Sequence, residues 1–167
     1  MAQAAVYAGS FDPPTLGHLD ILKRVAPHFS KVYVVIAKNH GKSNSLFTPE
    51  ERAELIKDAL EKHLPDAKVS VHVHSGLVVD FCREKNVKVL VRGLRAMSDF
   101  EKEFQIATMN RKFAPEIETM HVMTDEKYFF VSSTLVKEVA PFTDALKDLV
   151  PINVRKAVVK KLKEKSP

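Results

Sequence analysis

Short apolar runs alternate along the chain with longer stretches in which apolar side chains recur every three or four residues. Val32–Ala37 is continuous and β-branched, which is typical of a strand buried on both faces of a sheet. Val69–Val73 instead alternates its apolar residues with Ser70 and His72. Five strands are predicted: Ala4–Ala8, Val32–Ala37, Val69–Val73, Val87–Val91 and Ile117–Met123.

Helical periodicity fills the segments between these strands. Leu19, Leu22 and Ala26 share one face of a first helix. A second helix begins after Thr48, which is its predicted N-cap, and Glu51 completes a capping box. Further helices are predicted over Val78–Arg83, Asp99–Lys112 and Ser133–Val139, and around Asp144–Leu149 and Asn153–Lys163.

This alternation predicts an α/β fold. Consecutive βαβ units with right-handed crossovers give a parallel sheet of five strands, covered by helices on both faces. The last helices form a C-terminal helical extension of one domain that spans residues 1–167. A sheet of this kind binds ligands in the crevice outside the carboxyl ends of its strands.

The composition narrows the class of protein. Hydrophobic residues make up 45% of the chain and charged residues 28%, which suits a packed core. No apolar run approaches the roughly 18 residues of a membrane span, and Met1–Val6 does not resemble a signal peptide. The single cysteine, Cys82, cannot form an internal disulfide and indicates a reducing compartment. We therefore expect a cytoplasmic protein with no membrane partner.

The net charge of +5 and the isoelectric point near 9.3 raise the question of a nucleic-acid partner. The whole excess lies in residues 155–167, and the residues before them hold 20 basic and 20 acidic side chains. A basic C-terminal helix, over about residues 153–165, is more typical of a solvated surface than of a nucleic-acid reader. No aromatic residues stand among its lysines to stack on bases. We expect no nucleic-acid partner, and a basic binding module stays as the alternative from another class.

The strongest local signal is Gly9–His18, where a strand leads through a turn into a helix. The N–H groups of the turn and the hydroxyl of Ser10 can face a phosphate. Asp12 precedes proline, so its backbone is held away from the helical region and suits a turn. Gly17 and His18 fall in the first turn of the helix, where an imidazole can donate to an anion that the helix dipole favours.

Other phosphate-compatible groups follow the remaining strands. Arg92 and Arg95 flank a glycine just past the fourth predicted strand, and guanidinium groups bind phosphate oxygens bidentately. Lys42 follows the second strand, and the hydroxyls of Ser132–Thr134 open a helix after the fifth. Each group alone has a plain reading, as a surface cation or a helix cap. Their convergence at the carboxyl ends of parallel strands favours a nucleotide site.

Several other features predict no chemistry. His72 and His74 share a strand face but lack further ligands at a metal-binding spacing. Cys82 has no adjacent histidine or acid, which favours buried packing over a nucleophile. The phosphate-binding Gly-x-x-x-x-Gly-Lys-Ser/Thr and the dinucleotide-binding Gly-x-Gly-x-x-Gly motifs are both missing.

With these motifs the chain resembles the nucleotidyltransferases that carry a [His/Thr]-x-Gly-His signature, here Thr15–His18. Within that superfamily it is most similar to the phosphopantetheine adenylyltransferase family. The resemblance covers about residues 5–140. Its further blocks, in order, are Phe47–Arg52, Val91–Arg95, Asp99–Glu101 with Met109–Arg111, and Val131–Glu138.

The resemblance implies a Rossmann-like nucleotidyltransferase fold. It also implies transfer of the adenylyl group of ATP to 4′-phosphopantetheine, giving dephospho-coenzyme A and pyrophosphate in coenzyme A biosynthesis. The phosphate of the acceptor would attack the α-phosphorus of ATP in line, without a covalent enzyme intermediate. Magnesium is implied through the triphosphate, with no protein ligand indicated. Members of the family are typically homohexamers.

The resemblance also assigns site residues. His18 would stabilise the transition state at the α-phosphate. The residues implied to bind ATP are Ser10, Phe11, His18, Gly93, Leu94, Arg95, Glu103, Tyr128, Phe129, Phe130, Val131, Ser132, Ser133 and Thr134. Those implied to bind 4′-phosphopantetheine are Ser10, Lys42, Val78 and Arg92.

Three departures and two rival enzymes stand beside this assignment. Ser10 replaces a frequent threonine and Thr134 a frequent serine, both keeping the hydroxyl, while Tyr128–Phe130 stands where others often have Trp and Ser.

A nicotinate or nicotinamide mononucleotide adenylyltransferase shares the Gly-x-Phe-Asp-Pro and Gly-His elements, but usually shows Ser-Ser-Thr-x-Ile-Arg where this chain has Ser132–Lys137. It also lacks a block like Arg92–Arg95. A glycerol-phosphate cytidylyltransferase is the more distant rival.

Overall fold

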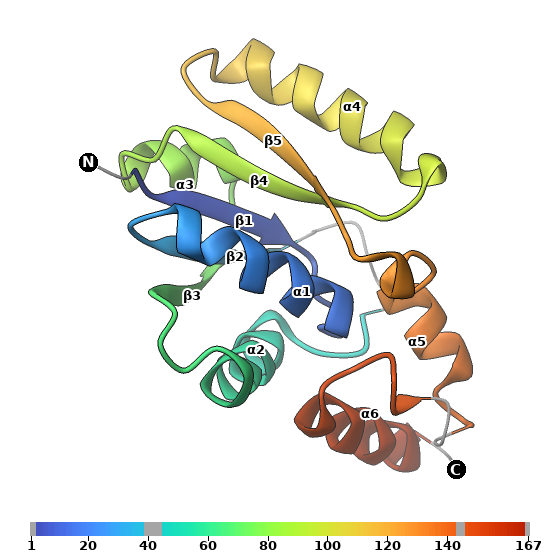
Figure 1. Cartoon of the computed structure of the whole chain (residues 1–167). Coiled ribbons are helices and arrows are strands. Elements are labelled where there is room, and N and C mark those ends of the chain that lie inside the picture. The colour runs from blue at the N-terminus through green and yellow to red at the C-terminus, as the bar shows by residue number, and fades with distance from the viewer. Residues whose placement is uncertain (1–2, 39–44, 143–145, 166–167) are drawn as a thin grey trace.

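The computed structural model describes residues 3–38, 45–142 and 146–165, apart from the side chains of residues 97, 98 and 165. The strands are β1 (Ala5–Gly9), β2 (Val32–Ala37), β3 (Val69–His74), β4 (Val89–Leu94) and β5 (Glu118–Met123). They form one sheet in the order β3-β2-β1-β4-β5, and each neighbouring pair runs parallel. The predicted α/β fold with a five-stranded parallel sheet is confirmed (Figure 1).

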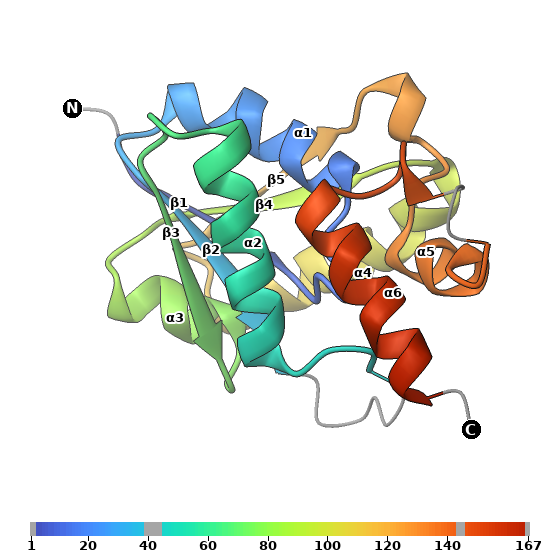
Figure 2. The same cartoon turned by 90° about the horizontal axis from the view of Figure 1, so that it is seen from below.

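The helices cover both faces of this sheet, as predicted. They are α1 (Leu16–Val25), α2 (Pro49–His63), α3 (Val78–Glu84), α4 (Met97–Phe113), α5 (Ser133–Val139) and α6 (Ile152–Lys165), with 3-10 turns η1 (Ala26–His28) and η2 (Glu126–Tyr128). Figure 2 shows α3 on the opposite side of the sheet from α1 and α2, and α6 beside α2. Within the described ranges, none of the helices has both the length and the apolar character to cross a bilayer.

The core is divided by the sheet. On one face, Leu22 of α1 and Ile56 of α2 pack against Val34 of β2 and neighbouring inward side chains. On the other face, Phe81 and Cys82 of α3 pack against the opposite side of the same strands. The plain reading of Cys82 as packing is consistent with its burial, which raises the pKa of the thiol to about 12.

A third cluster holds the C-terminal extension against the rest of the protein. Phe47 joins Val136 of α5 and Val154 and Val158 of α6 in this cluster. Two hydrogen bonds also connect the C-terminal extension to α1 and α2. The backbone N–H of Leu16 donates to Leu149 O at 2.9 Å, and Asn153 Nδ2 donates to Leu55 O at 2.9 Å. The Asn153 bond holds α6 along α2, and the Leu16 bond ties the turn before α6 to α1.

The structure corrects two boundaries. The fourth strand is Val89–Leu94 rather than Val87–Val91, because its parallel pairing with β5 continues as far as Leu94 and Met123. Arg92, Gly93 and Leu94 therefore lie within the strand rather than past it. Of the helix expected around Asp144–Leu149, the described residues 146–149 contain no α-helix. They form a tight turn because Leu146 is buried among α5 and α6, and its carbonyl accepts from Leu149 and Val150.

Candidate active site

A crevice opens where the winding of the sheet reverses, between β1 and β4. The ladder joins only Val6 to Leu90 and Tyr7 to Val91, although β1 continues to Gly9 and β4 continues to Leu94. The two strands therefore part at their carboxyl ends, as parallel sheets do at a topological switch point. The loop after β1 and the last residues of β4 form the two sides of this opening.

Gly9 and Phe11 shape the loop on the β1 side. Phe11 is buried, with its ring edge-on to Tyr7 at 5.5 Å and to the His18 imidazole at 4.9 Å between centroids. A Cβ at Gly9 would lie 3.0–3.2 Å from the Phe11 ring, so a larger residue there would displace the ring. Phe11 was expected to line the ATP site. Its side chain packs in the core against His18, and its contact with ATP stays a prediction.

His18 is held by a capping box at the start of α1. The backbone N–H of Thr15 donates to His18 Nδ1 at 2.9 Å, and the Thr15 hydroxyl lies 2.9 Å from the same nitrogen. Because an N–H group can only donate, Nδ1 is unprotonated and Nε2 carries the hydrogen. Burial lowers the pKa of His18 to about 3, with a further lowering from the nearby Arg95 and Arg92. His18 is therefore a neutral imidazole with one N–H donor on the edge away from Thr15.

Two arginines of the β4 end lie near His18, and each is already paired with a carboxylate. Arg92 donates to Glu103 at 2.7 and 2.8 Å and to Ala8 O at 2.6 Å. Arg95 donates to Asp99 at 2.9 and 3.0 Å and to Val131 O at 3.2 Å. The carboxylates fix the planes of both guanidinium groups.

Gly93 allows β4 to approach α1 closely. A Cβ at Gly93 would lie 2.5 Å from the Cδ1 atom of Ile21 and 3.6 Å from the hydroxyl of Tyr7. The adjacent Leu94 accepts a bond at its carbonyl from Thr124 N at 2.9 Å, which connects this end of β4 to the chain after β5. The Val91–Arg95 block thus combines close packing with two oriented cations.

The segment from Tyr128 to Thr134 forms another wall. Val131 is buried and its carbonyl accepts from Arg95, whereas Phe130 is 83% exposed. Ser132 accepts at its Oγ from Leu135 N at 2.9 Å, which is the plain helix-cap role. Ser133 donates to Pro13 O at 2.8 Å and so ties α5 to the loop after β1.

A cavity of about 570 Å³ adjoins this wall. Three of the predicted site residues, Ser10, Ser133 and Thr134, line it. The other lining residues are Asp12, Lys38, Ser45, Leu46, Phe47, Thr48, Pro49, Glu51, Arg52, Lys137 and Lys161. Four cationic side chains thus face two carboxylates there, and this excess of positive charge suits a phosphorylated ligand.

Asp12 and Arg52 form a buried centre beneath the cavity. Asp12 accepts from the backbone N–H groups of Leu46 and Phe47 at 3.0 Å each, and its Oδ1 lies 3.4 Å from Arg52 Nε. Arg52 donates to Phe47 O at 2.7 and 2.9 Å and to Ser10 O at 3.1 Å. Asp12 does more than shape the turn, because its carboxylate joins the β1 loop to the segment that leads into α2.

The sequence motifs do not include the other cavity cations. Lys38 directly follows β2, and Lys137 lies one helical turn after Ser133 and Thr134, with its Nζ 3.4 Å from Asp12 Oδ2. Both positions carried a usable signal, a strand end and a shared helix face. Lys161 lies on α6, far along the chain, and no local pattern points to it.

The structure leaves two residues expected on the acceptor side untested. Lys42 lies outside the described residues. Val78 opens α3 and packs beside the core cluster of Phe81 and Cys82, and it is not among the residues that line the cavity. Their roles toward 4′-phosphopantetheine stay predictions.

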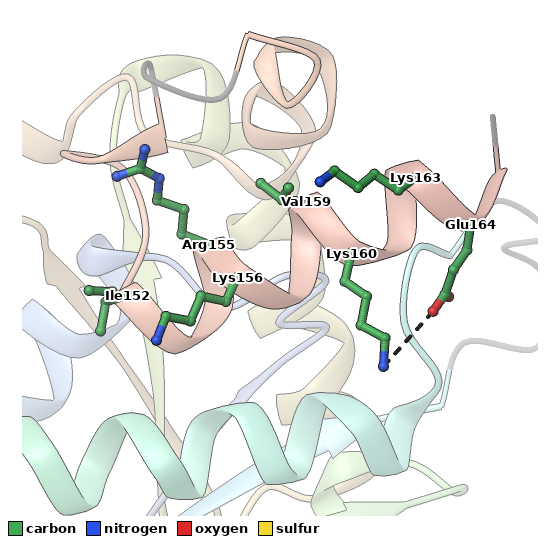
Figure 3. A pocket seen from close by; sticks show the side chains of 7 residues that line it. All are labelled: Ile152, Arg155, Lys156, Val159, Lys160, Lys163 and Glu164. Atoms are coloured by element: carbon green, nitrogen blue, oxygen red, sulfur yellow. Dashed lines mark ion pairs between the residues drawn. The ribbon is translucent and has the colours of Figure 1, made fainter.

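A second hollow, of about 630 Å³, is lined by described residues that all belong to α6. Its residues are Ile152, Arg155, Lys156, Val159, Lys160, Lys163 and Glu164, which form one stripe along the helix (Figure 3). This is the solvated basic face that the sequence predicted.

The described residues contain no group of three His, Cys, Asp or Glu side chains that could hold a metal ion. A protein cage for Mg²⁺ therefore does not fit these parts of the chain, and the cationic cavity would repel the bare ion. A magnesium ion coordinated mainly by triphosphate oxygens and water needs no such cage.

Comparisons with known proteins agree with this geometry. Residues 6–139 match the model of the cytidylyltransferase-like family. Phosphopantetheine adenylyltransferases from two strains of Leptospira biflexa serovar Patoc are each 50% identical over 161 residues, covering 96% of this chain and 98% of the relative. The crystal structure of a Vibrio parahaemolyticus protein assigned as a nicotinate-nucleotide adenylyltransferase has a TM-score of 0.68, with 16% identity and 99% and 98% of the two chains covered. At that identity the likeness shows the fold alone.

Proposed function

The chain belongs to the phosphopantetheine adenylyltransferase family, within the cytidylyltransferase-like family, and we propose that it adenylates 4′-phosphopantetheine with ATP. The products are dephospho-coenzyme A and pyrophosphate, in coenzyme A biosynthesis. The observation that carries this function is the identity of 50% over 96% of the chain. The site supports it with a neutral His18 donor, two oriented arginines and an adjoining cationic cavity.

His18 stabilises the transition state at the α-phosphate. As the acceptor phosphate attacks in line, negative charge grows on the non-bridging oxygens, and Nε2–H donates to one of them. The Thr15 contacts keep the donor on Nε2 before substrate binds, so no reorganisation is needed during the reaction. The acceptor phosphate is already anionic and needs no general base. No covalent enzyme intermediate forms.

Arg92 and Arg95 supply positive charge near His18. Arg95 binds the phosphates of ATP, together with the backbone of Gly93 and Leu94, and Arg92 binds the phosphate of the acceptor. Glu103 accepts with both carboxylate oxygens from Arg92, so its contribution to the site includes fixing that guanidinium. Asp99 does the same for Arg95.

The two substrates share the loop after β1. Ser10 follows β1 and lines the cavity, which supports assigning its hydroxyl to both phosphate groups. Lys42 and Val78 complete the acceptor side, and Tyr128–Thr134 borders the ATP. No described side chain is assigned to hold magnesium; carried on the triphosphate, the ion would neutralise charge on its oxygens.

The protein assembles as a homohexamer, and an exposed apolar surface on α4 and β5 supports contact with a second copy. Phe100 and Phe104 of α4 are 49% and 60% exposed, with their rings stacked at 5.9 Å. Met120 and Met123 of β5 are about half exposed. Scattered apolar residues are normal on a surface, but such a group marks an interface. Light scattering after size exclusion tests this: Phe104→Glu is expected to dissociate the hexamer, and an unchanged mass would contradict the contact.

We place the protein in the cytoplasm and expect no nucleic-acid partner. Removal of residues 155–167 distinguishes a nucleic-acid-binding module from an enzyme whose basic C-terminal helix is only a solvated surface. A binding module loses polynucleotide affinity with that segment, while the enzyme reading requires no such affinity in the full chain.

The deciding experiment measures pyrophosphate release from ATP and magnesium with three acceptor conditions: 4′-phosphopantetheine, nicotinate mononucleotide, and none. Release with 4′-phosphopantetheine alone is expected. Release with the mononucleotide instead would keep the fold and His18 but contradict the acceptor assigned through Arg92–Arg95. A folded, ATP-binding sample that uses neither acceptor would contradict the proposed function.

A further inference from the structure

Lys161 brings a charge from the C-terminal helix to the cavity beside the active site. It lines the same cavity as Ser10, Thr134 and Lys137, and its Nζ lies 2.7 Å from Glu51 Oε1. Its side chain is 28% exposed, so the ammonium group is partly covered but remains open to the cavity.

The packing of α6 fixes Lys161 in this position. Val154 and Val158 are fully buried in the third core cluster, and Lys161 follows them at a spacing of seven and three residues. Side chains at this spacing share one helix face. Lys160, one residue earlier, belongs instead to the stripe of α6 that lines the second hollow, here called the outer stripe. It pairs with Glu164 at 4.0 Å (Figure 3).

The local charges leave Lys161 with capacity for an anion. Its ammonium group has three hydrogens, and the ion pair with Glu51 uses one of them. Glu51 in turn accepts from Thr48 N at 2.8 Å with its other oxygen, so its carboxylate is shared between the helix cap and the lysine. Asp12, the second carboxylate of the cavity, is occupied by two backbone N–H groups, Arg52 and Lys137.

We propose that Lys161 is a phosphate-binding residue of the active-site cavity, so that the C-terminal helix completes the substrate site. This inference rests on the proposed function. Its ligand is a phosphate oxyanion, which in this reaction comes from the leaving pyrophosphate or from the acceptor. Neither the motif blocks of the chain nor the position of Lys161 in the sequence assigns it such a role.

Calorimetric titration with pyrophosphate and with 4′-phosphopantetheine tests the proposal. Lys161→Met is expected to lower the affinity for at least one of these ligands on the order of tenfold, because a charged hydrogen bond is lost. The ligand whose affinity falls identifies the source of the phosphate. Lys160→Met is the matched control, because it removes the same charge from the outer stripe, and it is expected to change neither affinity by more than about twofold. Unchanged affinities in Lys161→Met would overturn the proposal.

A second variant distinguishes ligand binding from a structural ion pair. Glu51→Gln keeps an oxygen for Thr48 N but removes the charge that holds Lys161. If Lys161 binds phosphate, Glu51→Gln raises the affinity for the affected ligand or leaves that affinity unchanged. If the ion pair is only structural, Glu51→Gln lowers the affinity as much as Lys161→Met does. The latter result would overturn the proposal. Lys161→Arg, which keeps a cation, is expected to restore most of the affinity.

Failure of this inference differs from failure of the proposed function. Wild-type protein that releases pyrophosphate with 4′-phosphopantetheine, while Lys161→Met binds both ligands normally, contradicts the role of Lys161 alone. Wild-type protein that binds neither ligand contradicts both.

Discussion

The two sides of the site are built in different ways. On one side, His18 is positioned by Thr15 and Phe11, so ten consecutive residues, Gly9–His18, contain the donor and its supports. On the other side, the cationic cavity gathers Lys38 from the end of β2, Lys137 from α5 and Lys161 from α6.

The difference has consequences for how each side responds to change. The His18 side depends on bonds within one strand–loop–helix unit, so a substitution there acts on the chemistry directly. The cavity side depends on the docking of distant elements, and the buried Asp12–Arg52 centre is where these two sides meet. Substitutions at that centre are expected to affect stability before chemistry.

The largest effect is expected at Arg52. Arg52→Met leaves Asp12 buried with its guanidinium partner removed, and loss of one member of a buried ion pair costs about 3–5 kcal/mol. Urea denaturation at one fixed protein concentration measures the free energy of unfolding. Lys57→Met on the same helix removes an exposed pair with Glu54 and is the control, with an expected change within about 0.5 kcal/mol. Equal effects in the two variants would contradict the central role of Arg52.

The next effect is on the chemical step. His18→Ala is expected to lower kcat on the order of 10²-fold or more, because it removes a donor aimed at the transition state. The affinity for ATP is expected to change much less. Steady-state kinetics and ATP titration measure the two quantities, with His28→Ala in the exposed turn after α1 as the control. A His18→Ala variant with near-normal kcat would refute the assignment.

The acceptor side is tested by Arg92→Ala and Lys42→Ala. Both are expected to raise the KM for 4′-phosphopantetheine on the order of tenfold, because each removes a cation assigned to its phosphate. The KM for ATP should change less. Steady-state kinetics with each substrate varied in turn supply the measurement, and a change confined to the KM for ATP would contradict the assignment.

A smaller effect is expected at the cap of α1. Thr15→Val keeps the size of the side chain but removes the oxygen at the helix start, at a cost of about 1 kcal/mol of stability. It also removes one of the two contacts that hold His18 Nδ1, while the backbone bond at 2.9 Å remains. The expected fall in kcat is therefore smaller than in His18→Ala. A fall as large as in His18→Ala would show that the hydroxyl, rather than the backbone, orients the imidazole.

The smallest expected effect on the His18 side is its response to pH. Its pKa of about 3 in the folded protein lies below the ordinary value of 6.5. The unfolded chain therefore binds a proton first, and the stability that His18 contributes is complete above pH 6.5 and is lost as the pH falls towards 3. Imidazole ¹⁵N NMR, assigned with His18→Gln, is expected to show a neutral ring with Nε2–H down to about pH 4. Titration of the ring near pH 6.5 would contradict this geometry.

Prediction from the sequence succeeded where the determinants are close together in the chain. Val32–Ala37 is a strand with the predicted bounds because it is a continuous β-branched run, and Thr48 and Glu51 form the predicted capping box. The end of β4 was misplaced because Arg92 and Gly93 look like a loop, and only their pairing with β5 makes them a strand. The turn at Leu146 departs from the predicted helix for a similar reason, since its packing among α5 and α6 is not visible in its own residues.

The sequence by itself determined the alternation of strands and helices, the Gly9–His18 loop and the family, because hydrophobic period, turn residues and motif spacing are local properties of the chain. Tertiary structure decided which charges meet. Arg92 pairs with Glu103, Asp12 with Arg52, and Lys161 reaches the cavity from α6. The physical reason is that these partners are brought together by the order of the strands and by the packing of α6 on α2, which depend on many distant contacts at once.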